Sequence, residues 1–557
     1  MSLPETSDRP AARRPIEAGL VLAFCCVGVM FAFHPMILSG FAKCQTNPGD
    51  PRLVNYILEH EYQCMWGRYP HRRLWSPPIF HPLQDTAAFT ENLLSMWPFY
   101  VPWRLAGLLP DTAFQLWTIT VAVLNYAAGF LFLRRCLKLG ALASCAGAWV
   151  FAFGCSRVAH VGHRQLLCHV YLIMAIWAIF KTFRTQERTG ERKAVGIWIA
   201  LFFAALTAQV YAGLYVAYFF LLALAVAGLW AMVMGRTRRA LLSLLWRHLP
   251  AILAAGAASL ACLWPLLTRY RAAARLLGPR PWEEVLSLLP TPACWLYMGT
   301  SNWLYGPLSG RGIYQGLSIP VEQAIGVGFL TLALACIGLA WWWRRPWVRV
   351  LVLVSLTLAL LVTLLPGGNT AWEYVYLYVP MAQGIRAVVR IGMLMLIPAG
   401  LGVAFFVEGM ANRGFLSRRR KLCAFAVLVL IAGAMLEQGA TTPAYDKYAA
   451  RAEVAEIARR IDPACQAFYY TASTGPIWKA QLDAMWAQFE VRKPTINGYS
   501  GGWPRDFDPL FDCIIRGPQD RQRIRAGLDH WIAVHGMQGQ NVCWIRPSGQ
   551  DITAPEQ

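Results

Sequence analysis

The chain has 557 residues, of which 57% are hydrophobic and only 15% are charged. Soluble globular proteins carry about 25% charged residues, so this composition excludes an ordinary soluble domain and indicates a membrane protein. The formal net charge of +21 is no sign of nucleic-acid binding, because the basic residues cluster in short segments beside apolar runs. Such clusters are typical of loops that lie against lipid, and we expect no nucleic-acid partner.

Apolar runs recur along the chain at lengths that suit a bilayer, which needs about 20 residues per helix. The first run lacks a small-residue cleavage site, so we expect an uncleaved span. We therefore predict a mainly α fold, a polytopic α-helical membrane protein. About eleven spans are expected, at 16–39, 112–133, 140–155, 165–183, 194–209, 212–234, 249–268, 322–343, 347–366, 389–410 and 421–438.

The basic clusters orient these spans, because short loops rich in Lys and Arg stay in the cytoplasm. A cluster containing Arg9 precedes the first span, and others follow every second span, which places the N-terminus in the cytoplasm. The apolar segment 92–109 contains Pro98, Pro102 and Arg104. Counting it as a span would break the alternation, so we interpret it as an interfacial or re-entrant helix.

This topology divides the chain into a transmembrane domain, residues 1–438, and a soluble extracytoplasmic domain, residues 439–557. This domain of about 120 residues is large enough for a small α/β fold. We predict a location in the plasma (inner) membrane, with the C-terminal domain on the periplasmic side. The outer loops are expected at 40–111 and 269–321. In the C-terminal domain we expect helices at 451–461 and 518–529 and strands at 468–471, 530–535 and 542–546.

The first outer loop carries the strongest candidate for chemistry. Asp50 follows the first span directly and lies between two prolines, in a turn that would hold a carboxylate at the membrane boundary. Asn55 and Glu59 are four residues apart and would share a helix face. Alternatively, Asp50 only stabilises the turn through its own backbone. Cys44 and Cys64 share this loop and could form a disulfide in an oxidising compartment.

Two further outer segments carry ionisable groups. His160 and His163 lie three apart before Gln165 and could ligate a metal, although a hydrogen-bonded interfacial histidine is the plainer interpretation. Arg386 and Arg390 lie four apart at the mouth of a span, and paired arginines at a helix start suit a phosphate group. The alternative is that they anchor the helix or pair with Glu322 or Glu373.

The order of these features resembles the GT-C superfamily of membrane glycosyltransferases. The likeness rests on an acidic residue after the first span, a His-Pro-Leu run at 81–83, a His/Gln-bearing second outer loop at 160–165 and a soluble outer domain. The sequence is similar to uncharacterised bacterial members with Gly49-Asp50-Pro51-Arg52-Leu53, Asn55 and Leu58-Glu59-His60. The resemblance covers about residues 16–410 and 497–501.

The resemblance implies a polyprenyl-phosphate sugar donor, an acceptor glycan, lipid or protein, and Asp50 as general base. It sometimes implies a divalent cation, Mg or Mn, for which Asp50 and His163 are candidate ligands. The chain has one Asp where the family usually has an acidic pair, and His where metal-dependent members have Asp or Glu, which leaves the cation open.

The expected catalytic residues are Asp50, Glu59 and His60. The expected substrate-binding residues are Arg52, Asn55, His81, His163, Gln165, Arg271, Arg386, Arg390, Tyr499 and Trp503. Trp478 and Trp486 are further sugar-stacking candidates beside Tyr499 and Trp503. Two other functions stay open, a lipid or glycan transporter (flippase) and a non-catalytic factor for envelope-glycan assembly.

Overall fold

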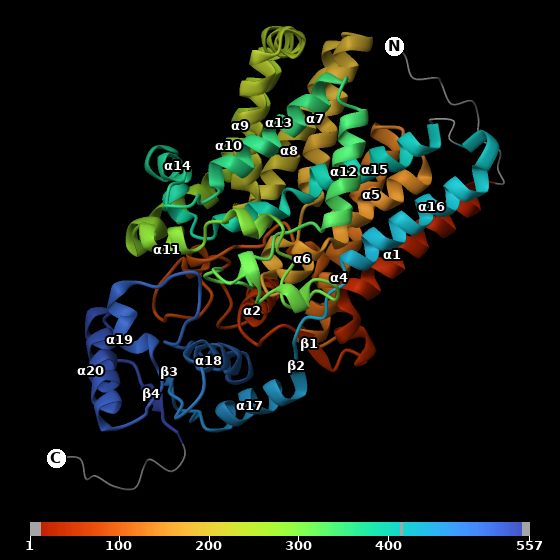
Figure 1. Ribbon diagram of the computed structural model, residues 1–557. Coiled ribbons are helices and arrows are strands. Elements are labelled where there is room, and N and C mark those ends of the chain that lie inside the picture. The colour runs from red at the N-terminus through yellow and green to blue at the C-terminus, as the bar shows by residue number, and fades with distance from the viewer. Residues whose placement is uncertain (1–12, 413–415, 548–557) are drawn as a thin grey trace.

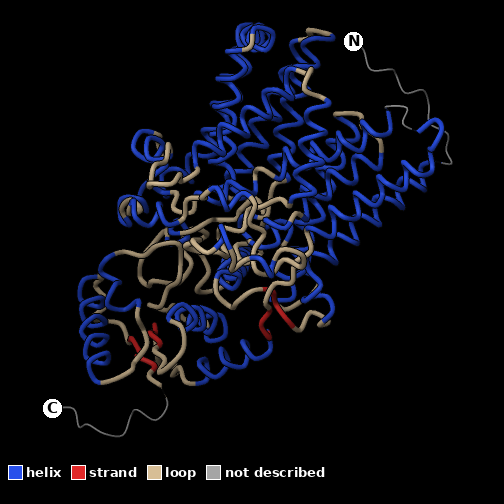
Figure 2. Tube along the Cα trace, viewed as in Figure 1, coloured by secondary structure: helices blue, strands red, loops and turns tan. Residues whose placement is uncertain are grey.

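The structure, a computed structural model, describes residues 13–412 and 416–547. Arg9 of the first basic cluster lies outside the described residues. A bundle of long helices makes up most of the molecule, and the C-terminal region covers one end of it (Figure 1). Loops and short helices gather in the layer between the two (Figure 2). Residues far apart in the sequence meet in this layer.

The long helices fall where the apolar runs predict them. Within the described residues, eight helices are long and apolar enough to cross a membrane, and three shorter apolar helices lie at 329–341, 346–362 and 424–437. The prediction of a mainly helical multi-pass membrane protein is thus confirmed. The bundle helices are α1 (Arg13–Leu38), α4 (Pro110–Leu131), α5 (Ala141–Phe153), α7 (Val170–Arg188), α8 (Arg192–Ala212), α9 (Leu214–Val233), α10 (Gly235–Leu277), α12 (Phe329–Trp341), α13 (Pro346–Val362), α15 (Leu396–Asn412) and α16 (Leu416–Glu437).

The centre of the bundle is made by α5 and α15, whose side chains are almost all buried. Small residues let these helices approach closely, as is usual in membranes. A Cβ added at Gly147 of α5 would lie 2.5 Å from the carbonyl oxygen of Gly400 in α15. The same holds between α12 and α15, where a Cβ at Gly338 would overlap the carbonyl of Gly402. These contacts fix the helices that carry the site at their ends.

The segment 92–109 contains only two short helices, at Trp97–Phe99 and at α3 (Val101–Leu105). Each begins with a proline in its first turn, so the chain turns instead of extending across the bundle. Arg104 pairs with Glu59 of α2 (Asp50–Met65), with 2.7 Å between Nε and Oε2. This arrangement agrees with an interfacial segment.

The C-terminal region contains β2 (Ala444–Asp446), α17 (Lys447–Arg459), β3 (Ala467–Tyr470), α18 (Ile477–Val491), α19 (Asp508–Phe511), α20 (Pro518–Val534) and β4 (Val542–Ile545). Strands β3 and β4 pair in parallel. The predicted strand at 530–535 is wrong, because α20 continues to Val534. Ile524, Leu528 and Trp531 are buried on one face of α20, and this tertiary packing outweighs the strand preference of the aromatic and β-branched residues.

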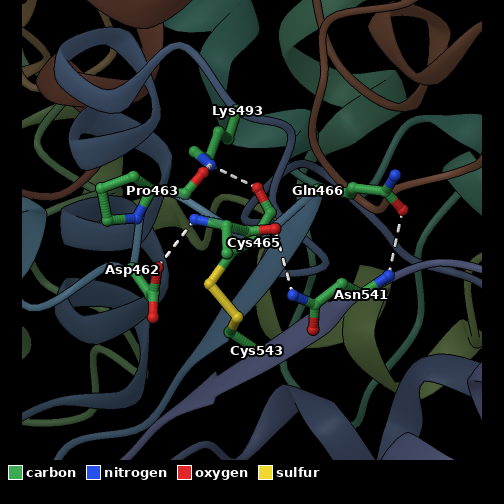
Figure 3. The surroundings of a disulfide bond; sticks show 8 residues. Asp462, Pro463, Cys465, Gln466, Lys493, Asn541 and Cys543 are labelled. Atoms are coloured by element: carbon green, nitrogen blue, oxygen red, sulfur yellow. Dashed lines mark hydrogen bonds between the residues drawn. A yellow bond between two sulfur atoms is a disulfide. The ribbon is translucent and has the colours of Figure 1, made fainter.

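A disulfide joins Cys465 to Cys543 of β4, across 78 residues (Figure 3). Lys493 donates to the carbonyl of Cys465, and the side chain of Asp462 accepts from the backbone N–H of Ala464 beside it. The suggested Cys44–Cys64 bridge is wrong. Cys44 is buried in β1 (Lys43–Gln45), which pairs with β2, while Cys64 lies in the last turn of α2, and both are free thiols.

Candidate functional site

The site is built on Asp50, the first residue of α2. Asn47 fixes the turn before it, since its Oδ1 accepts from the backbone N–H of Gly49 at 3.0 Å. The Asp50 side chain retains 26% exposure and faces a cavity of about 270 Å³. This cavity is lined by Thr46, Asn47, Gly49, Asp50, Pro51, Ala159, His160, Gly162, His163, Val321, Trp478 and Tyr499.

A chain of alternating charges runs inward from the cavity. Asp50 Oδ2 lies 2.7 Å from His163 Nδ1, and His163 Nε2 lies 2.5 Å from Glu322 Oε1. Glu322 also accepts two bonds from Arg390, at 3.1 Å from Nε and 2.9 Å from Nη2. His163 follows α6 (Cys155–Ala159) and Arg390 precedes α15, so three separate segments converge on α2.

These contacts determine the protonation of the site. Burial acts to raise the pKa of Asp50, but the contacts with His163 and Tyr499 outweigh it and lower that pKa below its usual value. Burial likewise opposes ionisation of Glu322, yet Arg390 and His163 hold its pKa well below the usual range. Burial and Arg390 disfavour the charged form of His163, but Glu322 and Asp50 raise its pKa overall. The favoured state is two carboxylates bridged by an imidazolium.

The C-terminal region completes the site from the opposite side. Tyr499 donates its hydroxyl to Asp50 Oδ1 at 2.7 Å, and burial together with the Asp50 charge raises the pKa of Tyr499. Trp478 of α18 lines the same cavity and lies beside Gly49. Asp50 is therefore held from both sides, by the bundle and by the C-terminal region.

The fit of a divalent cation can be judged from the same distances. Among the described residues, no group of three or more His, Cys, Asp or Glu side chains is arranged to hold a metal ion. His163 occupies the space between Asp50 and Glu322, with Nδ1 2.7 Å from Asp50 Oδ2 and Nε2 2.5 Å from Glu322 Oε1. A bridging cation would need that space, so this arrangement does not fit one.

The paired arginines bind carboxylates. Arg390 pairs with Glu322, which is the alternative anticipated from the sequence. Arg386 pairs with Glu284 of α11 (Trp282–Ser287), with 3.0 Å between Nη1 and Oε1, and its side chain is 39% exposed. Arg271, near the end of α10, is exposed and has no charged partner in the part of the chain that is described.

Glu59 and His60 lie further along α2 and do not line the cavity. Glu59 accepts from Arg104 and Tyr100, at 2.7 Å each. His60 Nδ1 lies 2.8 Å from His71 Nδ1, and burial lowers the pKa of His60 to about 4. Both residues hold α2 against its surroundings.

The other predicted binding residues mostly join elements together. Arg52 pairs with Asp483 at 2.5 Å, and His81 Nε2 lies 3.2 Å from Gln540 Oε1. Asn55 and Gln165 lie away from the cavity lining, as does Trp503, which stacks on Phe511 and donates to Asp508. Trp486 packs against Tyr56 and Phe489.

Glu322 was not proposed for the site, although it connects His163 to Arg390. It lies in an irregular segment after Ile319-Pro320-Val321, where the sequence offers only a lone acid ahead of an apolar run. No spacing rule identifies such a residue. Its role depends on contacts with segments 159 and 68 residues away, which only the fold reveals.

Comparison with solved structures identifies the architecture. The crystal structure of the apo oligosaccharyltransferase from Archaeoglobus fulgidus aligns with a TM-score of 0.51 and 9% sequence identity, over 96% of this chain and 70% of that chain. The chain therefore shares the fold of that membrane protein. This likeness agrees with the fold expected from the sequence resemblance, and at 9% identity it shows the fold alone.

Two further structures align over most of the chain. The Archaeoglobus fulgidus oligosaccharyltransferase AglB in complex with an inhibitory peptide and a dolichol-phosphate gives a TM-score of 0.48 at 10% identity, over 94% of this chain and 69% of that one. The arabinofuranosyltransferase AftD from mycobacteria gives 0.43 at 14% identity, over 83% of this chain and 30% of that one. The present chain thus spans less than a third of AftD. No protein-family model and no curated protein sequence matches it.

Proposed function

We propose that the chain is a membrane glycosyltransferase that moves a sugar from a polyprenyl-phosphate donor to an extracytoplasmic acceptor. The observation that carries this proposal is the Asp50 carboxylate, which faces a cavity lined by residues of both the bundle end and the C-terminal region. The GT-C fold supports it, as does the position of Asp50 directly after the loop that leaves α1. The acceptor is a hydroxyl-bearing glycan, lipid or protein.

In this mechanism the acceptor hydroxyl donates to Asp50 and its oxygen attacks the anomeric carbon of the donor sugar. The new C–O bond forms as the bond from the anomeric carbon to the lipid phosphate breaks, and the configuration inverts. The proton passes to Asp50, and the electron pair leaves with the phosphate. His163 and Tyr499 hold the carboxylate in position from two sides. No step requires a metal ion.

The departing lipid phosphate needs positive charge. Arg386 and Arg271 are the better candidates, because Arg271 is exposed and Arg386, although paired with Glu284, keeps a partly exposed side chain. Arg390 is 6% exposed and already binds both oxygens of Glu322. It therefore positions Glu322 and His163. Arg386→Lys should weaken donor binding because Lys loses the forked donor pair.

The Cys465–Cys543 disulfide supports an extracytoplasmic C-terminal region, since disulfides persist in oxidising compartments. With the N-terminus in the cytoplasm, Asp50 then lies at the outer face of the plasma membrane. A lipid-linked sugar in the outer leaflet could reach it there. Impermeant thiol labelling of single cysteines introduced near Arg134 and near Asp529 tests this orientation: labelling at 529 alone is expected.

The proposed transfer is tested with purified chain in lipid nanodiscs and radiolabelled polyprenyl-phosphate monosaccharides, with envelope glycan as acceptor. Asp50→Asn keeps the turn but cannot accept the proton, and should lower transfer about 100-fold or more. Asp85→Asn is the matched control, because Asp85 lies in the same loop and contacts Arg269 instead. Full activity in Asp50→Asn would show that Asp50 is structural.

A further inference from the structure

Asp50 shares its cavity with two aromatic side chains, Tyr499, whose hydroxyl donates to Asp50, and Trp478. Trp478 is half-buried, lines the cavity and, among the residues that the structure describes, has no hydrogen-bond partner for its indole N–H. Because the ring is only partly buried beside the cavity, this donor can bind a ligand there. Trp544 shows the contrast, since its indole N–H donates to Thr471 at 3.0 Å.

From this geometry we infer that Trp478 and Asn47 form the acceptor subsite and that the acceptor group bound there is a sugar ring. This inference rests on the proposed transferase function and names the chemical class of its acceptor. The negative face of an indole attracts the partly positive C–H groups of a sugar ring. Hydrogen-bonding groups around it then bind the ring hydroxyls.

The polar groups needed for such a ring stand beside Trp478. The Asn47 side chain uses its Oδ1 to accept from Gly49, which fixes the amide and leaves its NH₂ group for a ligand. Thr46 adds a hydroxyl to the same lining, and Asp50 accepts the hydroxyl that reacts. An aromatic surface with several hydroxyl-binding groups is what a saccharide requires.

The size and shape of the cavity favour a sugar over a peptide. At about 270 Å³ it lies below the roughly 300–1,000 Å³ of sites for larger ligands, so it takes a compact ring. An extended peptide is commonly held by pairing with an exposed strand edge. Among the described residues the cavity lining includes Thr46 after β1 but no residue of a named strand.

Gly49 keeps this subsite open. A Cβ at position 49 would lie 2.8 Å from Asn47 Oδ1 and 3.5 Å from the Trp478 ring. An alanine there would push the Asn47 amide out of position or narrow the space beside the ring. Gly49→Ala should therefore weaken saccharide binding through Asn47 while leaving Trp478 in place.

The test measures binding to the full chain in nanodiscs without donor lipid. The probes are trisaccharides of glucose, mannose, galactose and arabinose, and short peptides containing Asn, Ser or Thr. We expect at least one trisaccharide to bind and the peptides not to bind. Trp478→Ala should weaken that binding about tenfold, Trp478→Phe less, and the matched Trp544→Phe not at all.

The inference is overturned if only peptides bind or if no saccharide binds. It is also overturned if both Trp478 variants bind saccharide with the affinity of the wild type. If Trp478→Ala fails to fold, the comparison of Trp478→Phe with Trp544→Phe decides, because each change replaces an indole by the same smaller aromatic ring without an N–H. Failure of the proposed transferase function can be distinguished from failure of this inference. Saccharide binding through Trp478 without any transfer removes the enzyme but keeps the subsite, whereas transfer to a peptide removes the subsite and keeps the enzyme.

Discussion

Glu322→Gln should destabilise the chain far more than Glu284→Gln, although each change removes the carboxylate partner of one arginine. Glu322 and Arg390 are 14% and 6% exposed, whereas Glu284 and Arg386 are 30% and 39% exposed. Removing one partner of a buried pair leaves the other charge uncompensated and costs about 3–5 kcal/mol. An exposed pair is worth about 0–1 kcal/mol. Gln keeps the shape, so the comparison isolates charge.

Glu322 also carries the contact with His163, which brings its expected loss to at least the lower end of that range, about 3 kcal/mol. The free energy of unfolding is measured by reversible denaturant titration of the detergent-solubilised chain. The double variant Glu322→Gln/Arg390→Gln should recover part of the loss, because no buried charge is then unpaired. Equal destabilisation by Glu322→Gln and Glu284→Gln would refute the charge chain.

Three further outcomes follow from the same contacts. Tyr499→Phe removes the hydroxyl that helps to keep the pKa of Asp50 low, so the acid limb of a pH–activity profile should move to higher pH; an unmoved limb argues against Asp50 as base. The raised pKa of His163 means that its contribution to stability is complete below its ordinary pKa near 6.5 and is lost as pH rises through the raised value. The melting temperature of the wild type should therefore fall more steeply with rising pH than that of His163→Gln. An equal dependence of melting temperature on pH in the two proteins contradicts this. Reducing the Cys465–Cys543 disulfide should cost about 2–5 kcal/mol, seen as faster proteolysis of the C-terminal region, with a Cys44→Ala variant as the control that behaves like wild type.

The spans could be predicted because their cause is local. An apolar run of bilayer length must form a helix in lipid, since no water is present to bond its backbone. Each expected run coincides with an apolar helix, including the short ones at 329–341 and 346–362. The prediction of a strand at 530–535 was wrong because it relied on the composition of six residues. The spacing of Ile524, Leu528 and Trp531 instead continues one face of a helix.

The candidate site was predictable in part. Asp50, His163 and Tyr499 were each expected to bind or react, and the structure brings them together. Glu59 and His60 were grouped with Asp50 because they share its loop in the sequence. Once that loop forms α2, nine residues at 1.5 Å per residue place Glu59 about 13 Å from Asp50 along the helix. The two residues are therefore close in the sequence but not in the structure.

The hydrogen bond between Tyr499 and Asp50 spans 449 residues, and this has a consequence for biosynthesis. The helix that carries Asp50 is made near the start of translation, while its cover is made near the end. Until Tyr499 and Trp478 have been synthesised, Asp50 lacks its hydrogen bond from Tyr499, and the cavity beside Asp50 lacks the Trp478 side. A growing chain that has already inserted its helices therefore lacks part of the cavity that we propose binds the acceptor. The order of synthesis thus makes the proposed site complete only once the C-terminal region has folded over it.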